Sequence, residues 1–154
     1  MKKAELILAN FDARIPKIEI KPKNTDSKVV FSSKMYDEEN GEKISVKIHF
    51  SNVAAIDFRI NLFDCMIGAE AFGLYCIRDK EFIESITRGI FDRRKEVFLL
   101  EGNYNYDEAD EHDMLNCYDV SGDFRNSMDN YAAFVQNVEG GEYIIIAKQV
   151  RVER

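Results

Sequence analysis

The stretch Lys43-Ile44-Ser45-Val46-Lys47-Ile48-His49-Phe50 alternates without a break, with an apolar residue at every even position and a polar residue at every odd one. A period of two is typical of a β-strand that has one buried and one solvated face. The apolar stretch from Lys28 to Tyr36 precedes it, and Asn40-Gly41 supplies residues that accept positive φ in the connection. Residues 28–50 are therefore predicted to form a β-hairpin.

Further strands are predicted on both sides of the chain's middle. Alternation resumes after Ser51-Asn52, with Ile56, Phe58, Ile60 and Leu62 on one face, which predicts a third antiparallel strand. The remaining strand-like stretches are 74–77, 97–100, 115–120, 132–138 and 143–152. The paired glycines Gly140-Gly141 predict a second hairpin between the last two of these.

One long helix is predicted near residues 80–94. Asp79 is a good N-cap, and the apolar residues that follow it have helical spacing (Phe82, Ile83, Ile86, Ile90). A short N-terminal helix is expected within 1–14. The pattern indicates an α+β class and a single domain over 1–154, built from a mostly antiparallel sheet of about seven or eight hairpin-linked strands. An open sheet and a partly closed barrel both fit this pattern.

Composition sets the broad class of the protein. With 154 residues, 45% of them hydrophobic, and with eleven Phe and seven Tyr, the chain has enough apolar surface for one ordinary core and does not resemble a disordered protein. It has no apolar stretch long enough to cross a bilayer, and its N-terminal apolar stretch is too short for a secretion signal. Three widely spaced cysteines fit reduced thiols, so we expect a cytoplasmic protein that does not bind membranes.

Negative charge is concentrated in residues 101–142. This segment carries eleven carboxylates against one cation, Arg125, which gives it a charge of −10 in a chain whose total is −7. A field of one sign repels nucleic acid and attracts cationic partners. The densest part is Asp107-Glu108-Ala109-Asp110-Glu111-His112-Asp113, and the nearby Tyr104 and Tyr106 add side chains that suit a protein interface.

No catalytic, metal or cofactor site is predicted. The acidic cluster 107–113 lacks the glycine and the closing glutamate of a calcium-binding loop. The chain has only two histidines, no CxxC or HxxxH spacing and no glycine-rich phosphate-binding motif. We therefore expect no metal ion and no cofactor, and we expect a protein that is not an enzyme.

The leading hypothesis is a non-catalytic binding protein that presents the acidic face 101–142 to a cationic protein partner. The expected contacts are Tyr104, Tyr106, Asp107, Glu108, Asp110, Glu111 and Asp113. In size, charge and class the chain is similar in type to bacterial immunity proteins, which cover the basic substrate sites of nuclease toxins, although no residue motif carries that comparison.

Two alternatives stay open at this point. The first is a small-ligand-binding domain or hydrolase-type enzyme with a pocket between sheet and helix, lined by His49, Asp57 and Arg59 from solvated strand positions. The second is a homo-oligomer formed through self-complementary apolar surface.

Overall fold

The computed structural model describes residues 3–9, 13–23, 26–60, 70–100 and 126–154. The chain divides into two compact units, one formed by residues 1–79 with 131–154 and the other by 80–130. Each unit is described by itself below. The single domain over 1–154 stays a prediction.

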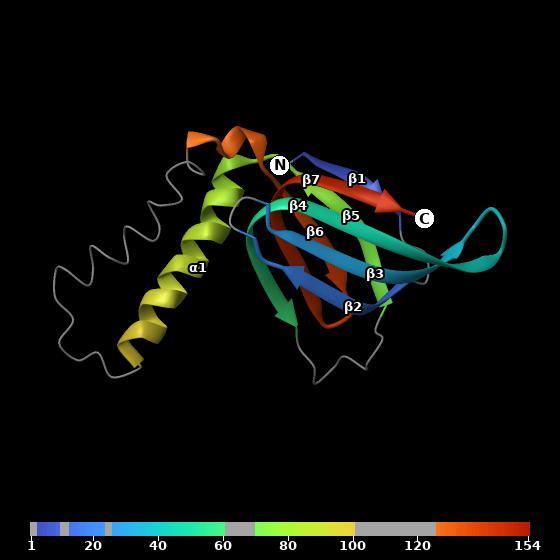
Figure 1. Ribbon diagram of the computed structural model, residues 1–154, viewed down its shortest axis with the longest axis horizontal. Helices are drawn as coiled ribbons and strands as arrows, with labels where there is room; N and C mark the ends of the chain where they lie inside the picture. The colour runs from blue at the N-terminus through green and yellow to red at the C-terminus, as the bar shows by residue number, and fades with distance from the viewer. Residues whose placement is uncertain (1–2, 10–12, 24–25, 61–69, 101–125) are drawn as a thin grey trace. The chain divides into compact units, whose positions relative to one another are not determined.

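The first unit is an antiparallel sheet that closes on itself (Figure 1). Its seven described strands are β1 (Ala4–Leu8), β2 (Ala13–Lys21), β3 (Lys28–Asp37), β4 (Glu42–Ile60), β5 (Glu70–Ile77), β6 (Ala132–Val138) and β7 (Gly141–Glu153). Their order is β1-β5-β2-β3-β4-β7-β6, and an additional pairing of β5 with β6 closes the ring. The predicted antiparallel, largely hairpin-linked sheet is confirmed, and it takes the form of a six-stranded closed barrel joined by β1.

Strands β1 and β2 lie end to end along one edge of β5. Ala4 pairs with Ile77 at the start of β1, and Arg14 pairs with Glu70 near the start of β2. The expected short helix within 1–14 is therefore wrong over Ala4–Leu8, which is a strand. Pairing with β5 satisfies its backbone and places Leu8 in the core, and this tertiary pairing outweighs the weak helical spacing.

The β3–β4 hairpin is confirmed with the predicted turn. Gly41 has φ +69°, and its N–H donates to the carbonyl of Asp37 at 2.8 Å. The third strand expected after Asn52 is not a new strand, because β4 continues to Ile60. Asn52 has φ +52° and the β4–β7 register shifts between Val53 and Ala55, so this position is a bulged bend within one long strand.

The β6–β7 hairpin is also confirmed. Gly140 has φ +89°, in the left-handed region that glycine adopts at no steric cost. A Cβ atom on Gly141 would lie 1.9 Å from the carbonyl oxygen of Arg59 on β4, so the backbones of β7 and β4 approach too closely there for any side chain. The two glycines therefore have different functions, one in the turn and one in strand packing.

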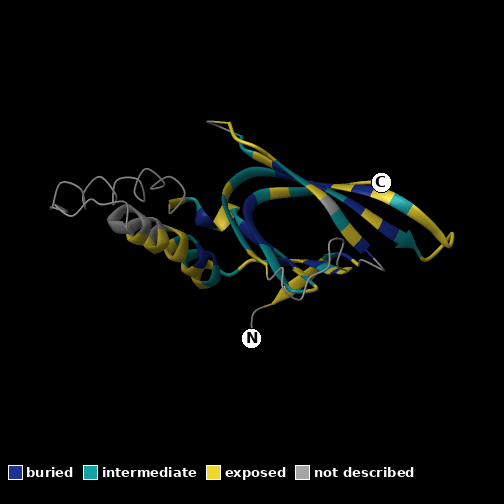
Figure 2. Ribbon diagram, turned by 90° about the horizontal axis from the view of Figure 1, so that it is seen from below, coloured by how far each residue is buried: buried dark blue, intermediate teal, exposed yellow. Residues whose placement is uncertain are grey.

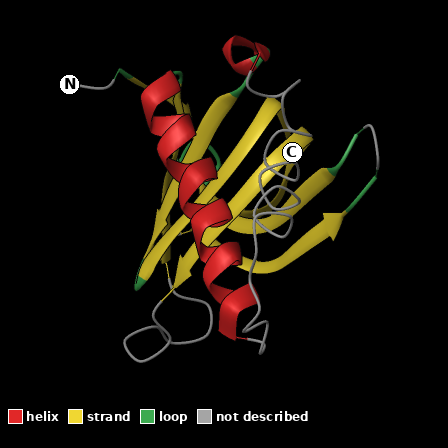
Figure 3. Cartoon of the chain, turned by 90° about the vertical axis from the view of Figure 1, so that its left-hand side faces the viewer, coloured by secondary structure: helices red, strands yellow, loops and turns green. Residues whose placement is uncertain are grey.

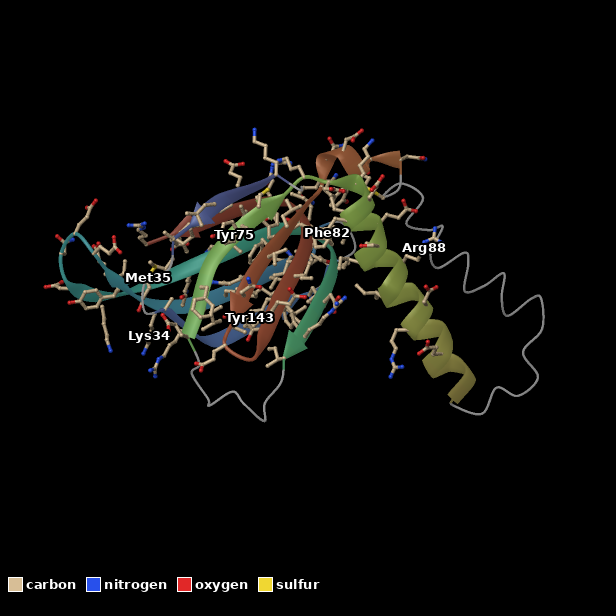
Figure 4. All side chains as sticks on the ribbon, turned by 180° about the vertical axis from the view of Figure 1, so that it is seen from behind. Lys34, Met35, Tyr75, Phe82, Arg88 and Tyr143 are labelled. Carbon is tan, nitrogen blue, oxygen red and sulfur yellow. The ribbon has the colours of Figure 1, made fainter. Side chains whose placement is uncertain are left out.

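Aromatic rings fill the middle of the barrel. Phe31 lies 5.2 Å from Phe50 and 5.4 Å from Tyr143, measured between ring centroids, and both pairs meet edge to face. Tyr143 also lies 4.9 Å from Phe58, and Phe50 lies 5.5 Å from Phe134. Tyr143 is labelled among the strands in Figure 4. The cluster joins β3, β4, β6 and β7, which makes it the centre of the core.

Burial alternates along the first half of β4 and along the second half of β3, as the predicted period of two requires, whereas residues 144–147 of β7 are all buried. On β3, Met35 is buried and the preceding Lys34 is exposed; both are labelled in Figure 4. Figure 2 shows the same alternation of buried and exposed residues along other strands. The interior is therefore apolar, and the outer face carries polar residues together with buried apolar ones such as Ile144 and Ile146.

The second unit contains α1 (Lys80–Leu100) and the short 3-10 helix η1 (Met128–Asn130). The predicted helix near 80–94 is confirmed, and it continues as one helix through Gly89 (Figure 3). The strand expected at 97–100 is wrong, because these residues form the end of α1. The strand expected at 115–120 lies outside the described residues. Within the described part of the chain, no helix is both long and apolar enough to cross a membrane.

Candidate functional site

The residues predicted to bind a partner lie outside the part of the chain that the structure describes. These are Tyr104, Tyr106, Asp107, Glu108, Asp110, Glu111 and Asp113. Their partner-binding function therefore stays a prediction. Only the last part of the acidic segment, residues 126–142, can be placed.

Two of the three acidic residues in 126–142 lie near cations. Asp129 Oδ1 lies 2.6 Å from Lys80 Nζ in the helical unit, and both side chains are more than 60% exposed. Glu142 is the register partner of Arg59 across β4 and β7. Glu139 is exposed. The concentrated negative charge therefore belongs to residues 101–125, which carry eight carboxylates and the single cation Arg125.

His49 lies on the outer face of β4, beside β7. Its Nε2 atom is 2.9 Å from Oε2 of Glu153, and the Arg151 guanidinium lies 3.5 Å from the same oxygen. A histidine that is hydrogen-bonded to a carboxylate supplies two of the three members of a catalytic triad, the base and the acid that orients it. Among the described residues, however, no hydroxyl or thiol donates a hydrogen bond to His49. The arrangement can orient an imidazole, but it contains no nucleophile.

Asp57 and Arg59 lie further along β4, beyond the bend at Asn52. They form an ion pair of 2.7 Å on the outer face. The hydrogen bonds that the Arg59 guanidinium donates to Asp57, followed by the charges of Asp57 and Glu142, raise the pKa of Arg59. No contact that the structure describes joins this pair to His49. All three residues lie on the outer face of β4, but they belong to two separate ion-pair groups.

A hollow that the sequence did not indicate lies where β2, β3 and the bend of β4 meet. Its volume is about 240 Å³, and its walls are almost entirely apolar. The aliphatic lining comes from Ile20, Pro22, Val29, Val53 and Ile56, with Ala54 and Ala55, and the polar lining comes from Ser27 and Lys28. All these residues belong to the barrel unit.

Hydrogen bonds between the β2–β3 connection and the bend of β4 fix this hollow. The N–H of Asn52 donates to Oδ1 of Asp26 at 3.0 Å, and the N–H of Val53 donates to the carbonyl of Ser27 at 2.9 Å. The Ser27 hydroxyl in turn donates to the carbonyl of Lys23 at 2.8 Å. Two segments far apart in sequence are therefore tied together, which shapes the wall before any ligand arrives.

Lys28 lines this hollow, and further lysines of β2, β4 and the β2–β3 connection act on two nearby carboxyl groups. The hydrogen bond and charge of Lys17, and secondarily the charges of Lys21 and Lys47, lower the pKa of Glu19. The hydrogen bond from the Asn52 N–H, followed by Lys28 and Lys23, lowers the pKa of Asp26. Across 17–28, four lysines face two acids. The surface at this end of the barrel is therefore cationic.

The polar side chain of Gln136 points into the barrel interior, and only part of its hydrogen-bonding capacity is used. Gln136 is fully buried, and its amide nitrogen donates to the carbonyl of Phe72 at 3.0 Å, where a register shift interrupts the pairing of β5 with β6. Its Oε1 atom is buried and accepts no hydrogen bond from the residues that the structure describes. The bulge in β5 leaves the carbonyl of Phe72 available, which explains why the amide nitrogen of Gln136 donates to it.

Metal binding and thiol chemistry find no support in the described part of the chain. It contains no cluster of three or more histidine, cysteine or acidic side chains that would hold a metal ion. Cys76 is buried, and burial raises the pKa of its thiol, which makes it a poor nucleophile at neutral pH.

Comparison with known proteins yields no relative: no protein-family model, curated protein or solved structure matches this chain.

Proposed function

We propose that this protein is a non-catalytic binding protein that docks a cationic protein partner through its acidic segment, 101–142. The observation that carries the proposal is the charge of residues 101–125, where eight carboxylates accompany Arg125 as the only lysine or arginine. Acidic fields of this density steer basic partners and raise association rates.

The pairing of Asp129 with Lys80 narrows the proposed site. Asp129 and Glu142 each lie near a cation, which supports placing the proposed contact among the eight carboxylates of 101–125. Asp107, Glu108, Asp110, Glu111 and Asp113 form the proposed charged contact, and Tyr104 and Tyr106 add apolar area at low entropic cost. An immunity-type protein, which covers a basic surface on a toxic enzyme, is one partner relationship of this kind.

The test is affinity capture from the native host at low salt, followed by elution at high salt. The bait is the wild-type protein and the double variant Asp110→Lys/Glu111→Lys. The control is Glu38→Lys/Glu39→Lys, which makes the same change in net charge at two adjacent exposed acids of the β3–β4 turn. We expect a basic protein that the wild type and the control retain and that the 110/111 variant loses.

A second measurement separates specific docking from general attraction. The association rate of the captured protein should fall steeply as salt is raised, because screening shortens the range of the acidic field. Equal capture by both double variants, or an association rate that salt leaves unchanged, would overturn the proposal.

A further inference from the structure

The hollow at the bend of β4 has the composition of a binding site for a small amphiphilic molecule. Its lining combines aliphatic side chains from three chain segments, and one large apolar side chain, Ile20, is 56% exposed beside it. Ile20 pairs with Val29, which in turn pairs with the core residue Phe50. Ile20 therefore lies on the inner face of the strand at the open end of the barrel, and it loses water contact only if something covers it.

The size of the hollow limits the apolar part of its occupant. A protein cavity of about 150 Å³ with apolar walls holds one benzene molecule. The hollow here measures about 240 Å³ and opens to solvent. It therefore suits a single short alkyl chain or one ring, with the remainder of the molecule outside. It is too small to form a protein–protein interface.

The charge at the rim selects the polar end of that molecule. Lys28 lines the hollow, and its Nζ lies 3.5 Å from Oδ2 of Asp26. Asp26 already accepts the N–H of Asn52, and Glu19 is engaged by Lys17 and Lys21 at 3.2 and 4.0 Å. Lys17, Glu19 and Lys21 alternate along β2 with the inward-facing Ile20, so they lie on its outer face, and the cation that lines the hollow is Lys28, in a stretch with four lysines and two acids.

We propose that this hollow binds a small aliphatic carboxylate, with the alkyl chain against Ile20, Val29 and Ile56 and the carboxylate at Lys28. The site belongs to the barrel and uses no residue of 101–142. It is a second binding function, and its failure would leave the docking of a cationic protein untouched.

The primary test is an NMR titration of the isotope-labelled full chain with octanoate. We expect saturable chemical-shift changes confined to the amides of 20–29 and 52–56, with a dissociation constant of about 0.1–1 mM. Octanol, which has the same chain without the charge, should bind at least about fivefold more weakly, and acetate, which has the charge without the chain, should not bind detectably.

Two variants locate the site. Ala54→Phe places a ring from an exposed lining position into the hollow and should weaken octanoate binding at least about tenfold, whereas Ala4→Phe adds the same ring at an exposed alanine of β1 and should not. Lys28→Gln should reduce the preference for octanoate over octanol, whereas Lys43→Gln, on the β3–β4 hairpin, should preserve it.

Several outcomes would overturn this proposal. One is the absence of saturable octanoate binding, and another is binding that Ala54→Phe leaves unchanged. Equal affinity for octanol and octanoate would show that the hollow does not select an anionic ligand. If the protein binds anionic phospholipid vesicles but not free octanoate, the ligand is a lipid surface and not a free carboxylate.

Discussion

The side-chain amide of Gln136 donates a hydrogen bond to the carbonyl oxygen of Phe72 at 3.0 Å, across the bulge that interrupts β5. The same side chain is fully buried in the barrel, with its Oε1 atom unsatisfied. One buried amide thus stabilises an irregular strand at the cost of one unpaired acceptor.

Gln136→Glu tests this arrangement through pH. The burial of an ionised carboxylate without a partner should destabilise the fold by roughly 3–5 kcal/mol at neutral pH. Because burial raises the pKa of such a carboxyl in the folded state, the loss should shrink as pH falls toward the unfolded value and grow as pH rises above it. Urea unfolding at several pH values measures both effects. Asn137→Asp, the same change at the exposed neighbouring residue, should have little effect, and a pH-independent loss at position 136 would contradict the account.

Phe31→Ala removes the ring at the centre of the aromatic cluster. Phe31 is 1% exposed and contacts the rings of Phe50, Phe58 and Tyr143. We expect a loss of about 3–5 kcal/mol in the free energy of unfolding, measured by chemical denaturation. Phe72→Ala is the matched control, because that ring is 47% exposed, and it should cost far less. Similar losses at both positions would contradict the assignment of the core.

Asn52→Val tests the bend in β4. Asn52 has φ +52°, which β-branched residues adopt only at a cost of about 1–2 kcal/mol. Valine should lower the free energy of unfolding by this amount more than Asn52→Gly does. Both variants lose the amide side chain and keep the backbone N–H that donates to Asp26, so the difference between them reports the conformational cost. Equal stability of the two variants would show that the bend does not require this conformation.

Asp26→Asn tests the tie between the β2–β3 connection and β4. The Asn52 N–H, helped by Lys28 and Lys23, lowers the pKa of Asp26 in the folded chain. Its stabilising effect is therefore present above the unfolded pKa of about 3.9 and is lost as pH falls through the lower folded value. Wild type should lose more stability between about pH 5 and pH 3 than Asp26→Asn, whose side-chain oxygen accepts the same hydrogen bond without titrating. Identical pH profiles in urea unfolding would contradict this linkage.

The thiol of Cys76 should react slowly in the folded protein. Burial raises its pKa, so little thiolate is present at neutral pH and little of it is accessible. The test uses Cys65→Ser/Cys117→Ser, in which Cys76 is the only thiol. Iodoacetamide should label this variant slowly in buffer and rapidly in urea. Rapid labelling of the folded variant would mean that Cys76 is exposed or activated.

The strands that could be predicted from sequence are those whose pattern is local. Residues 43–50 alternate strictly, and the glycines at 41 and 140 mark turns that demand positive φ. Where alternation and turn chemistry agreed, the predicted hairpins are present. The helix after Asp79 was predicted on the same local grounds.

The sequence-based predictions were wrong where the local pattern fits two structures and contacts between distant residues decide between them. Ser51-Asn52 fits a hairpin turn as well as a bulge. The hydrogen bonds that the N–H groups of Asn52 and Val53 donate to Asp26 and Ser27 make it a bulge. Residues 4–8 follow the same rule, because pairing with β5 makes them a strand. Barrel closure is likewise a long-range property, since Ala71 on β5 pairs with Val138 on β6.

The hollow could not be predicted, because none of its residues is unusual by itself. Ile20, Val29 and Ile56 each fit an ordinary strand, and only the fold brings them together. One signal was available: Val53-Ala54-Ala55-Ile56 breaks the alternation by one residue, which marks a bulge and therefore a change in strand direction. The partner contact proposed at 107–113 rests on charge alone, and the capture experiment tests it.

Ile77 and Ala133 are register partners at the ends of β5 and β6, although 55 residues separate them in the sequence. Strand β5 thus ends and β6 begins at paired positions, so the intervening stretch is an insertion within one hairpin. Each doubling of such an excursion adds only about 0.6 kcal/mol of closure entropy. This pair of positions is therefore the natural point at which the length of the excursion can change, by evolution or by engineering, while the register of the surrounding strands is kept.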